Sequence, residues 1–259
     1  MSPVFRIGLP LVALLCGGAL LSSCGGGGSS GLTKTTPTPT STYVPSGCDA
    51  ATYAPNYITQ NSGDAGDATS SGFSFWRHFP ISVYIAPTDS ATRASTVKGF
   101  NEWVVATGNR ASYKIVSSAT GADLTVKFSA LSPTSDTLGL TTVYYIQGQN
   151  YITNADMELF VYNADGSVNS ANNSNGINQT IAAHEFGHAL GIGPHSLVAS
   201  DLMYYSIGPD EGFKPVSTRD LNTLKSIYCN NFPTASALER TPSGQVKSRT
   251  LPPFQRAKS

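Results

Sequence analysis

The sequence predicts a mixed α/β (α+β) fold, a sandwich in which a twisted sheet packs over two long helices. Two observations carry this prediction. Short segments with alternating apolar and polar residues, typical of half-buried strands, interleave with a segment whose apolar residues recur at helical spacing. A second helical segment follows a long polar loop. Residues 48–231 are expected to form one domain, because that length can bury a substantial core.

The expected elements follow one another along the chain. A strand is expected over residues 78–86, and Asp89 and Ser90 then offer an N-cap to a backing helix. The apolar positions of that helix are Ala94, Val97, Phe100 and Val104, with Trp103 beside them. Four further strands are expected at residues 113–116, 124–128, 140–146 and 157–161. The polar loop 163–176 then leads to a helix over residues 177–190.

A pair of histidines distinguishes this second helix. His184 and His188 are four residues apart, so a helix that turns about 100° per residue places both on one face. Both can direct a ring nitrogen at one ion about 2.0–2.1 Å away. Glu185 lies on the flank of that face, where a carboxylate can act as a general base. We expect this face to line a cleft and the opposite face to pack into the core.

The segment after the helix is expected to supply a third ligand. Gly191 can adopt a positive φ and turn the chain back, and His195 follows. The whole run resembles the pattern H-E-x-x-H-x-x-G-x-x-H of the metzincin zinc peptidases. In this chain the third histidine comes one residue late, because Pro194 stands where the pattern has it. We favour His195 as the third ligand, and Asp201 is the alternative.

Other segments strengthen the resemblance, which covers roughly residues 75–228. Asp201-Leu202-Met203-Tyr204 looks like the Met-turn, in which a methionine lies as an apolar floor beneath the metal ligands. Residues 217–228 resemble the final helix of the matrixin branch, and residues 122–128 a core strand of it. The resemblance implies a metzincin-like catalytic domain with a mostly parallel sheet, a backing helix, an active-site zinc helix and a C-terminal helix.

The resemblance also implies a zinc endopeptidase. Three neutral imidazoles leave zinc one open position, where a bound water is acidified to a pKa of about 7. Glu185 would deprotonate this water as it attacks a peptide carbonyl and would return the proton to the leaving amine. An extended protein or peptide substrate is expected along the strand edge around residues 139–145, a binding mode that requires no free terminus.

The segment after Met203 is expected to form the wall of a substrate pocket, with Tyr204, Tyr205 and Phe213. Matrixins commonly carry a proline at the position of Tyr205, whereas the astacin and serralysin branches carry a tyrosine whose hydroxyl hydrogen-bonds the oxyanion. The resemblance therefore makes Tyr205 a candidate catalytic residue. The alternative is that Tyr205 only lines the pocket or packs under the turn.

A calcium ion is a weaker expectation. Asp165 and Gly166 stand in the polar loop 163–176, and related folds often hold calcium. The same residues are also typical of an ordinary turn.

The N-terminal residues predict export and lipidation. Arg6 supplies a positive charge, and residues 7–21 form an apolar run. Proline and glycine within this run interrupt it, so it is a poor candidate for a membrane-spanning helix. A membrane-spanning anchor is the alternative. Leu21-Ser22-Ser23-Cys24 resembles the lipobox of bacterial lipoproteins. The resemblance implies removal of residues 1–23 and a lipid on Cys24 that anchors the chain to the bacterial cell envelope, at the outer membrane or cell surface. Residues 24–47 would form a flexible tether.

Two cysteines remain beside the lipidation candidate and Cys16 of the apolar run. In an oxidising compartment Cys48 and Cys229 are expected to form a disulfide that closes nearly the whole domain, and two buried thiols are the alternative. Residues 232–259 are expected to be a polar, disordered tail.

Composition excludes some functions. Lys+Arg and Asp+Glu both number 16, so no net field attracts nucleic acid or an anionic surface. Only 12% of the residues are charged, against about 25% in ordinary soluble proteins, which is typical of extracellular proteins. A monomer is expected. A catalytically inactive surface lipoprotein that binds zinc or a partner is the alternative function, although a purely structural site has no use for Glu185.

Overall fold

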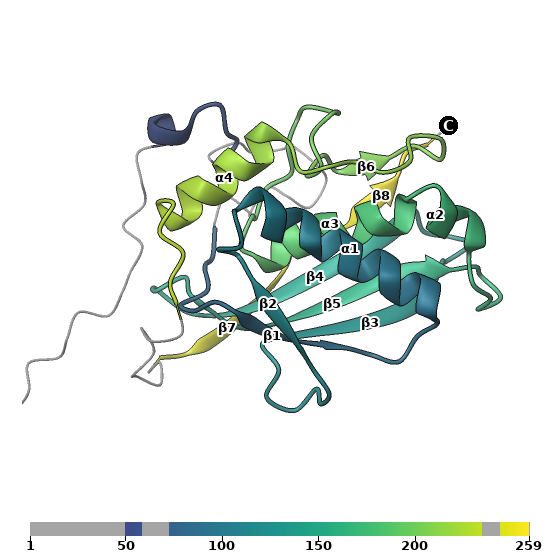
Figure 1. The fold of residues 1–259 in the computed structure, drawn as a ribbon, viewed down its shortest axis with the longest axis horizontal. Coiled ribbons are helices and arrows are strands. Elements are labelled where there is room, and N and C mark those ends of the chain that lie inside the picture. The colour runs from purple at the N-terminus through teal and green to yellow at the C-terminus, as the bar shows by residue number, and fades with distance from the viewer. Residues whose placement is uncertain (1–49, 59–72, 235–243, 259) are drawn as a thin grey trace, which may run out of the picture. The chain divides into compact units, whose positions relative to one another are not determined.

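The computed structural model describes residues 50–58, 73–234 and 244–258, which belong to one compact unit from Thr42 to Ser259 (Figure 1). Its helices are η1 (Ala50–Tyr53, a 3-10 helix), α1 (Ser90–Ala106), α2 (Ser170–Ser174), α3 (Ile177–Ala189) and α4 (Thr218–Tyr228). Its strands are β1 (Ile81–Ile85), β2 (Tyr113–Val116), β3 (Leu124–Ala130), β4 (Thr137–Ile146), β5 (Ile152–Tyr162), β6 (Ser206–Ile207), β7 (Val246–Thr250) and β8 (Phe254–Arg256). No helix in these ranges has the length and hydrophobicity to cross a bilayer.

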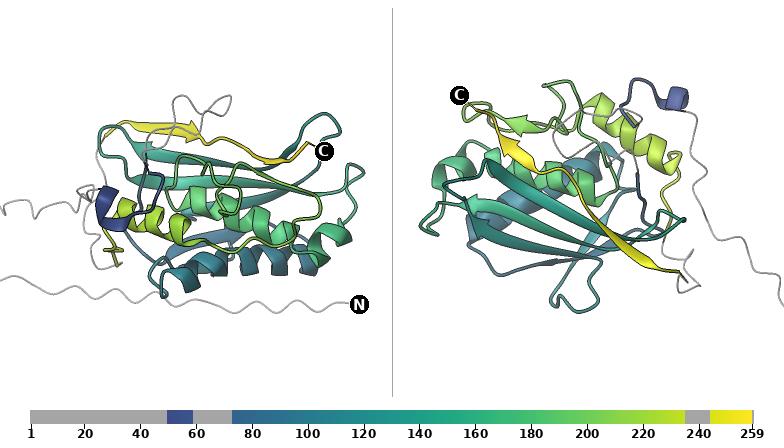
Figure 2. Two further views of the ribbon diagram at one scale, coloured as in Figure 1. Left: turned by 90° about the horizontal axis from the view of Figure 1, so that it is seen from above. Right: turned by 180° about the vertical axis from the view of Figure 1, so that it is seen from behind.

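The strands form one sheet with the order β2-β1-β3-β5-β4-β8-β6, and β7 pairs with β4 as well. Pairing is parallel from β2 to β5 and antiparallel between β5 and β4. The helices α1 and α3 lie side by side on one face of the sheet (Figures 1 and 2). The mixed α/β fold with a mostly parallel sheet over two helices is thus confirmed, as is the C-terminal helix.

Close packing between the two long helices positions α3. A Cβ atom at Gly99 of α1 would come within 2.5 Å of the Gln179 carbonyl oxygen, so only glycine allows this approach. The indole N–H of Trp103 donates to the carbonyl oxygen of Ala183 at 2.7 Å. These contacts fix the position of the α3 backbone relative to α1, on the face of the sheet that both helices cover.

The C-terminal residues correct the expectation of a disordered tail after residue 231. β7 pairs antiparallel with Thr142–Ile146 of β4, and β8 pairs with Thr137 and Gly139 of the same strand. Phe254 is fully buried and Leu251 nearly so. The composition of the tail is polar because β7 exposes most of its side chains, and its pairing with β4 is a tertiary contact without a local signal. The folded part therefore extends to the end of the described chain.

The surroundings of α3 correct a second expectation. Every residue of this helix except Gln179 is buried, whereas one face was expected to line an open cleft. The covering elements include β4, β5 and β8, which all contact α3. The short helix α2 within the expected loop 163–176 was also not predicted. Its N-cap is Asn169, whose side chain accepts a hydrogen bond from the Asn172 amide.

Candidate metal centre

Three histidines meet at one point. The Nε2 atoms of His184, His188 and His195 lie 3.2 Å from one another in each pairing, and all three side chains are buried. The Nδ1–H of His184 donates to the Leu202 carbonyl oxygen at 2.9 Å, and that of His188 to the Ile192 carbonyl oxygen at 2.7 Å. An imidazole that donates through Nδ1 keeps the lone pair of Nε2 free, so the two helix histidines are oriented for coordination.

Electrostatics favour the metal-binding form of the helix histidines. Burial, with the neighbouring His195, lowers the pKa of His188 to about 3. Burial also lowers the pKa of His184 well below its ordinary value, and the imidazoles nearby add to the effect. Both rings are therefore neutral near pH 7.

The donor set fits zinc. A tetrahedral zinc ion with bonds of about 2.0–2.1 Å separates its ligand atoms by about 3.3 Å, close to the 3.2 Å between the Nε2 atoms. Within the described residues these histidines form a group of three, with no fourth histidine, cysteine or carboxylate in it. Three protein ligands and an open position are typical of catalytic rather than structural zinc sites.

Of the two candidate third ligands, only His195 lies in the histidine group that the described residues form. His195 joins the helix pair, whereas the Asp201 carboxylate accepts hydrogen bonds from Ser217 Oγ at 2.7 Å, from Arg219 Nε at 2.9 Å and from Ser196 Oγ. The loop between Gly191 and His195 absorbs the extra residue. Gly191 has a φ of 113°, and a Cβ atom there would lie 1.9 Å from the Ser74 carbonyl oxygen, so the turn requires glycine.

Glu185 is fully buried beside these ligands. Its Oε2 accepts a hydrogen bond of 2.6 Å from Thr141 Oγ1, whereas its buried Oε1 has no partner among the described residues. Burial raises the pKa of Glu185 to about 8, against the opposing effect of Thr141. A buried carboxylate oxygen without a partner is costly, so the position is suited to a group that protein atoms do not supply, such as a water or a substrate amide.

Met203 lies beneath the two helix histidines, the position that the Met-turn resemblance implies. It is fully buried, and a Cβ atom at Gly187 would come within 2.5 Å of its sulfur. Gly187 stands between the two helix histidines in the sequence, so the methionine packs directly under that turn of α3.

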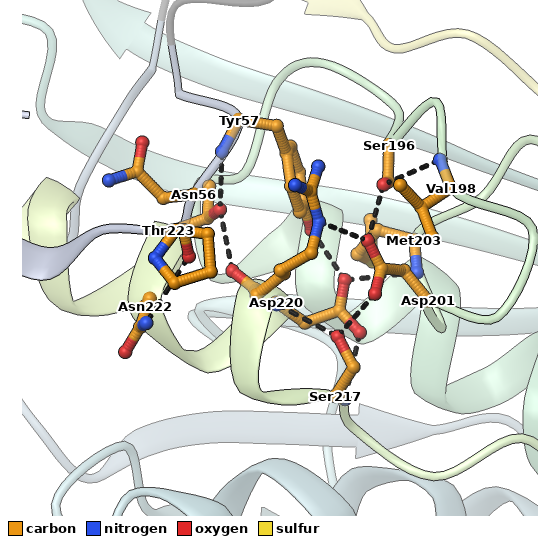
Figure 3. A network of polar contacts seen from close by, with 12 residues as sticks. Asn56, Tyr57, Ser196, Val198, Asp201, Met203, Ser217, Asp220, Asn222 and Thr223 are labelled. Atoms are coloured by element: carbon orange, nitrogen blue, oxygen red, sulfur yellow. Dashed lines mark hydrogen bonds and ion pairs between the residues drawn. The ribbon is translucent and has the colours of Figure 1, made fainter.

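A buried polar network holds the Met-turn backbone (Figure 3). The Asp220 carboxylate accepts hydrogen bonds from the amides of Leu202 at 2.9 Å and Met203 at 3.3 Å. It also accepts from the Ser217 amide at 2.9 Å and the Tyr57 hydroxyl at 2.7 Å. Neither Asp220 nor Tyr57 was predicted from the sequence as part of the site. The capping box formed by Ser217 and Asp220 was a local signal for the carboxylate, but Tyr57 lies 163 positions away and has none.

Two tyrosines after the Met-turn line a cavity of about 520 Å³. Tyr204 and Tyr205 form one part of its wall, and residues 255–258 form another. The Tyr205 ring lies 6.5 Å from the His195 ring, measured between centroids. Phe213 was expected in this wall but packs against Gly176 at the start of α3, where a Cβ atom would lie 2.7 Å from the Phe213 Cβ.

The remaining predicted sites have different outcomes. Asp165 accepts hydrogen bonds from the amide and hydroxyl of Ser167 at 2.9 and 2.6 Å, which is turn geometry, and calcium binding stays a prediction. Cys229 is disulfide-bonded. Its expected partner Cys48, like the lipidation candidate Cys24, lies outside the described residues.

Comparison with known proteins identifies a family. Residues 79–229, more than half of the chain, match the family model described as Matrixin, a peptidase family. No curated protein matches. Two solved structures of myroilysin are similar to the chain. The alignment with one of them has a TM-score of 0.36 and 16% sequence identity, and it covers 60% of this chain and 83% of the myroilysin chain. The alignment with the other has a TM-score of 0.27 and 18% sequence identity, and it covers 64% of this chain and 69% of the myroilysin chain. At these scores the two structures add nothing to the family match.

Proposed function

The chain belongs to the matrixin family of peptidases, and on that premise we propose that it is a zinc-dependent endopeptidase. The observation that carries the proposal is the meeting of the three Nε2 atoms of His184, His188 and His195 at 3.2 Å beside the buried Glu185. This arrangement supplies ligands, an open position and a base together.

Each residue of the site has a separate role in the proposed reaction. A bound zinc ion would supply a Lewis acid that acidifies a water and polarises a peptide carbonyl. Glu185 would accept the proton of the attacking water and deliver it to the leaving amine. Its raised pKa of about 8 falls when a cation lies nearby, so the carboxylate form needed for a base is favoured in the metal-loaded protein. Tyr205, whose ring lies 6.5 Å from the His195 ring, is the proposed donor to the developing oxyanion.

We also propose the setting in which the enzyme works. The lipobox-like sequence before Cys24 supports a lipid anchor in the bacterial cell envelope, with the domain acting as a monomer. A disulfide between Cys48 and Cys229 agrees with the bonded state of Cys229. Mass spectrometry of the mature N-terminus should find diacylglyceryl-modified Cys24, and an unmodified or differently processed terminus would mean a secreted protein without an anchor.

The function is tested by replacing Glu185 with alanine. We expect the purified chain to bind about one zinc ion, and the variant to keep it while turnover of unfolded protein falls by about 10²–10⁴-fold. Because β8 lies over the site, turnover is measured on the intact chain and after a specific protease cuts it between residues 235 and 243. The control is Glu102→Ala, which removes a carboxylate from helix α1 instead of from the metal centre.

Wild-type turnover in the Glu185→Ala variant would contradict the proposed mechanism, and so would cleavage by metal-free protein. A protein that binds zinc but shows no turnover in either the intact or the cut form would instead be the inactive binding lipoprotein, the alternative function.

A further inference from the structure

The C-terminal segment, residues 244–258, occupies the edge of the sheet that a peptide substrate would need. β7 pairs with β4 over Thr142–Ile146, and β8 pairs with it at Thr137 and Gly139. Together they cover the edge around residues 139–145 on which an extended peptide was expected. The right-hand view of Figure 2 shows the segment in yellow along the outer strand of the sheet.

β8 also reaches the metal centre. The ring of Phe254 stacks on the His184 imidazole with centroids 4.1 Å apart and planes inclined by 22°, and it is fully buried. Gly139, the β4 partner of Phe254, packs directly on the Glu185 carboxylate. The segment therefore lies over both the first ligand and the proposed base.

The segment is held as an extended peptide between two backbone edges. The amide of Gln255 donates to the Tyr205 carbonyl oxygen at 2.9 Å, and that of Ala257 to the Ile207 carbonyl oxygen at 2.9 Å. On the other side the Arg256 amide donates to the Asp136 carbonyl oxygen at 2.7 Å. β8 is antiparallel to β4 and parallel to β6. These main-chain hydrogen bonds are the ones through which any extended peptide could bind here, whatever its sequence.

We propose that residues 244–258 are an intramolecular blocking segment that occupies the substrate groove, so that the intact chain is latent until this segment leaves. The proposal rests on the proposed peptidase function, because it identifies the groove by the metal site beneath it. The occupant also indicates the class of substrate: an extended peptide with a large aromatic side chain against the His184 ring.

The segment can leave while the strands from β2 to β4 stay paired, at the cost of the pairing between β8 and β6. β4 stays paired with β5 from Gly139 to Tyr145 when its other edge is free. β7 exposes most of its side chains, including Val246 at 52%, so burial is concentrated at Leu251, Pro252 and Phe254. Pro252 and Pro253 have no amide hydrogen, and the pairing with β4 is interrupted there between β7 and β8. Loss of the contact made by Phe254 should therefore open the part of the groove next to the metal.

The test compares Phe254→Lys with Val246→Lys in the full chain. Both place a cation in the same segment, but the first replaces a buried ring against the metal site and the second an exposed side chain. We expect Phe254→Lys to raise turnover of a fluorogenic peptide by about 10- to 100-fold, because substrate binding scales with the open fraction of molecules. Val246→Lys should match the unsubstituted chain. A synthetic peptide of residues 244–258 should inhibit Phe254→Lys, and the same peptide with lysine at position 254 should not.

A second readout does not depend on activity. Hydrogen exchange of the β4 amides at residues 137–146 should be faster in Phe254→Lys than in Val246→Lys. If Phe254→Lys fails to fold, the same measurements are made on the wild-type chain after it has folded and been cut between residues 235 and 243. The released segment is then removed by dilution.

The outcomes separate the two proposals. Equal turnover of the intact and opened forms would overturn latency and leave the peptidase function standing. Unchanged exchange of the β4 amides, or no effect of the added peptide, would also overturn it. Faster exchange and binding of the added peptide without turnover in any form would support the blocking segment and refute the peptidase activity.

Discussion

Replacing Asp220 with asparagine would test whether one buried carboxylate holds the metal centre in place. Its Oδ1 accepts hydrogen bonds from the Tyr57 hydroxyl and the Met203 amide, and its Oδ2 accepts from the amides of Leu202 and Ser217. Asparagine keeps the shape of the side chain but turns one oxygen into an NH₂ donor. Whichever oxygen is replaced, two donors lose their acceptor.

The expected cost follows from those two bonds. A hydrogen bond to a charged acceptor contributes about 1.5–3 kcal/mol, so two of them contribute about 3–6 kcal/mol. Part of this is offset in the native protein, because burial raises the pKa of Asp220 and so penalises its ionised form. We therefore expect Asp220→Asn to lower the free energy of unfolding by about 2–4 kcal/mol.

A second effect should appear in the metal affinity. The Leu202 carbonyl oxygen accepts the Nδ1–H of His184 at 2.9 Å, so a loosened Leu202 amide loosens the first ligand. Loss of such an orienting contact lowers zinc affinity by about 10- to 100-fold.

Urea unfolding of the metal-free and zinc-saturated proteins near neutral pH measures the first effect, and competition with a chromophoric chelator measures the second. Asp210→Asn, at an exposed position, is the control. An Asp220→Asn variant within about 0.5 kcal/mol of the unsubstituted chain, with the same zinc affinity, would refute the reasoning.

Three further predictions concern the site and its surroundings. Gly139→Ala should lower turnover of the opened enzyme while zinc content stays constant, because the new methyl group would lie 2.4 Å from Glu185 Oε1; unchanged kinetics would show that the carboxylate tolerates displacement. Asp123→Asn should lower the free energy of unfolding by about 1 kcal/mol near neutral pH. Burial raises the pKa of Asp123, but its hydrogen bonds outweigh burial, so the pKa in the folded protein is lower than the ordinary value. The stabilisation by the Asp123 carboxylate is therefore complete at a pH above the ordinary pKa, and it is lost as the pH falls through the lowered pKa of the folded protein. A difference in urea unfolding that does not shrink as the pH falls below the ordinary pKa would contradict this sign. Tyr205→Phe should lower kcat of the opened enzyme by about 100-fold with little change in KM, whereas an unchanged kcat would leave Tyr205 as a pocket wall.

The core of the metal site could be predicted because its determinants are local. His184, Glu185 and His188 lie within about one turn of one helix, whose periodicity alone places them on adjacent parts of its surface. Gly191 was recognisable as the residue that ends the helix, since only glycine easily adopts its positive φ. Alternation and helical spacing likewise identified β1, β2 and α1, whereas α4 was expected only from the family resemblance. The third ligand could only be narrowed to His195 or Asp201, because the path of a loop is not periodic.

What the sequence determined by itself was therefore the short-range chemistry: two candidate ligands, a candidate base, the N-cap of α1 and the strands β1 to β5. What only the tertiary structure decided was which distant segments complete and cover that chemistry. Tyr57 reaches Asp220 across 163 positions, and the C-terminal residues pair with β4 along an edge that their own composition does not reveal. The physical reason is that backbone periodicity fixes neighbours a few residues apart, whereas strand pairing depends on which backbone edge is left unpaired when the rest of the sheet has formed.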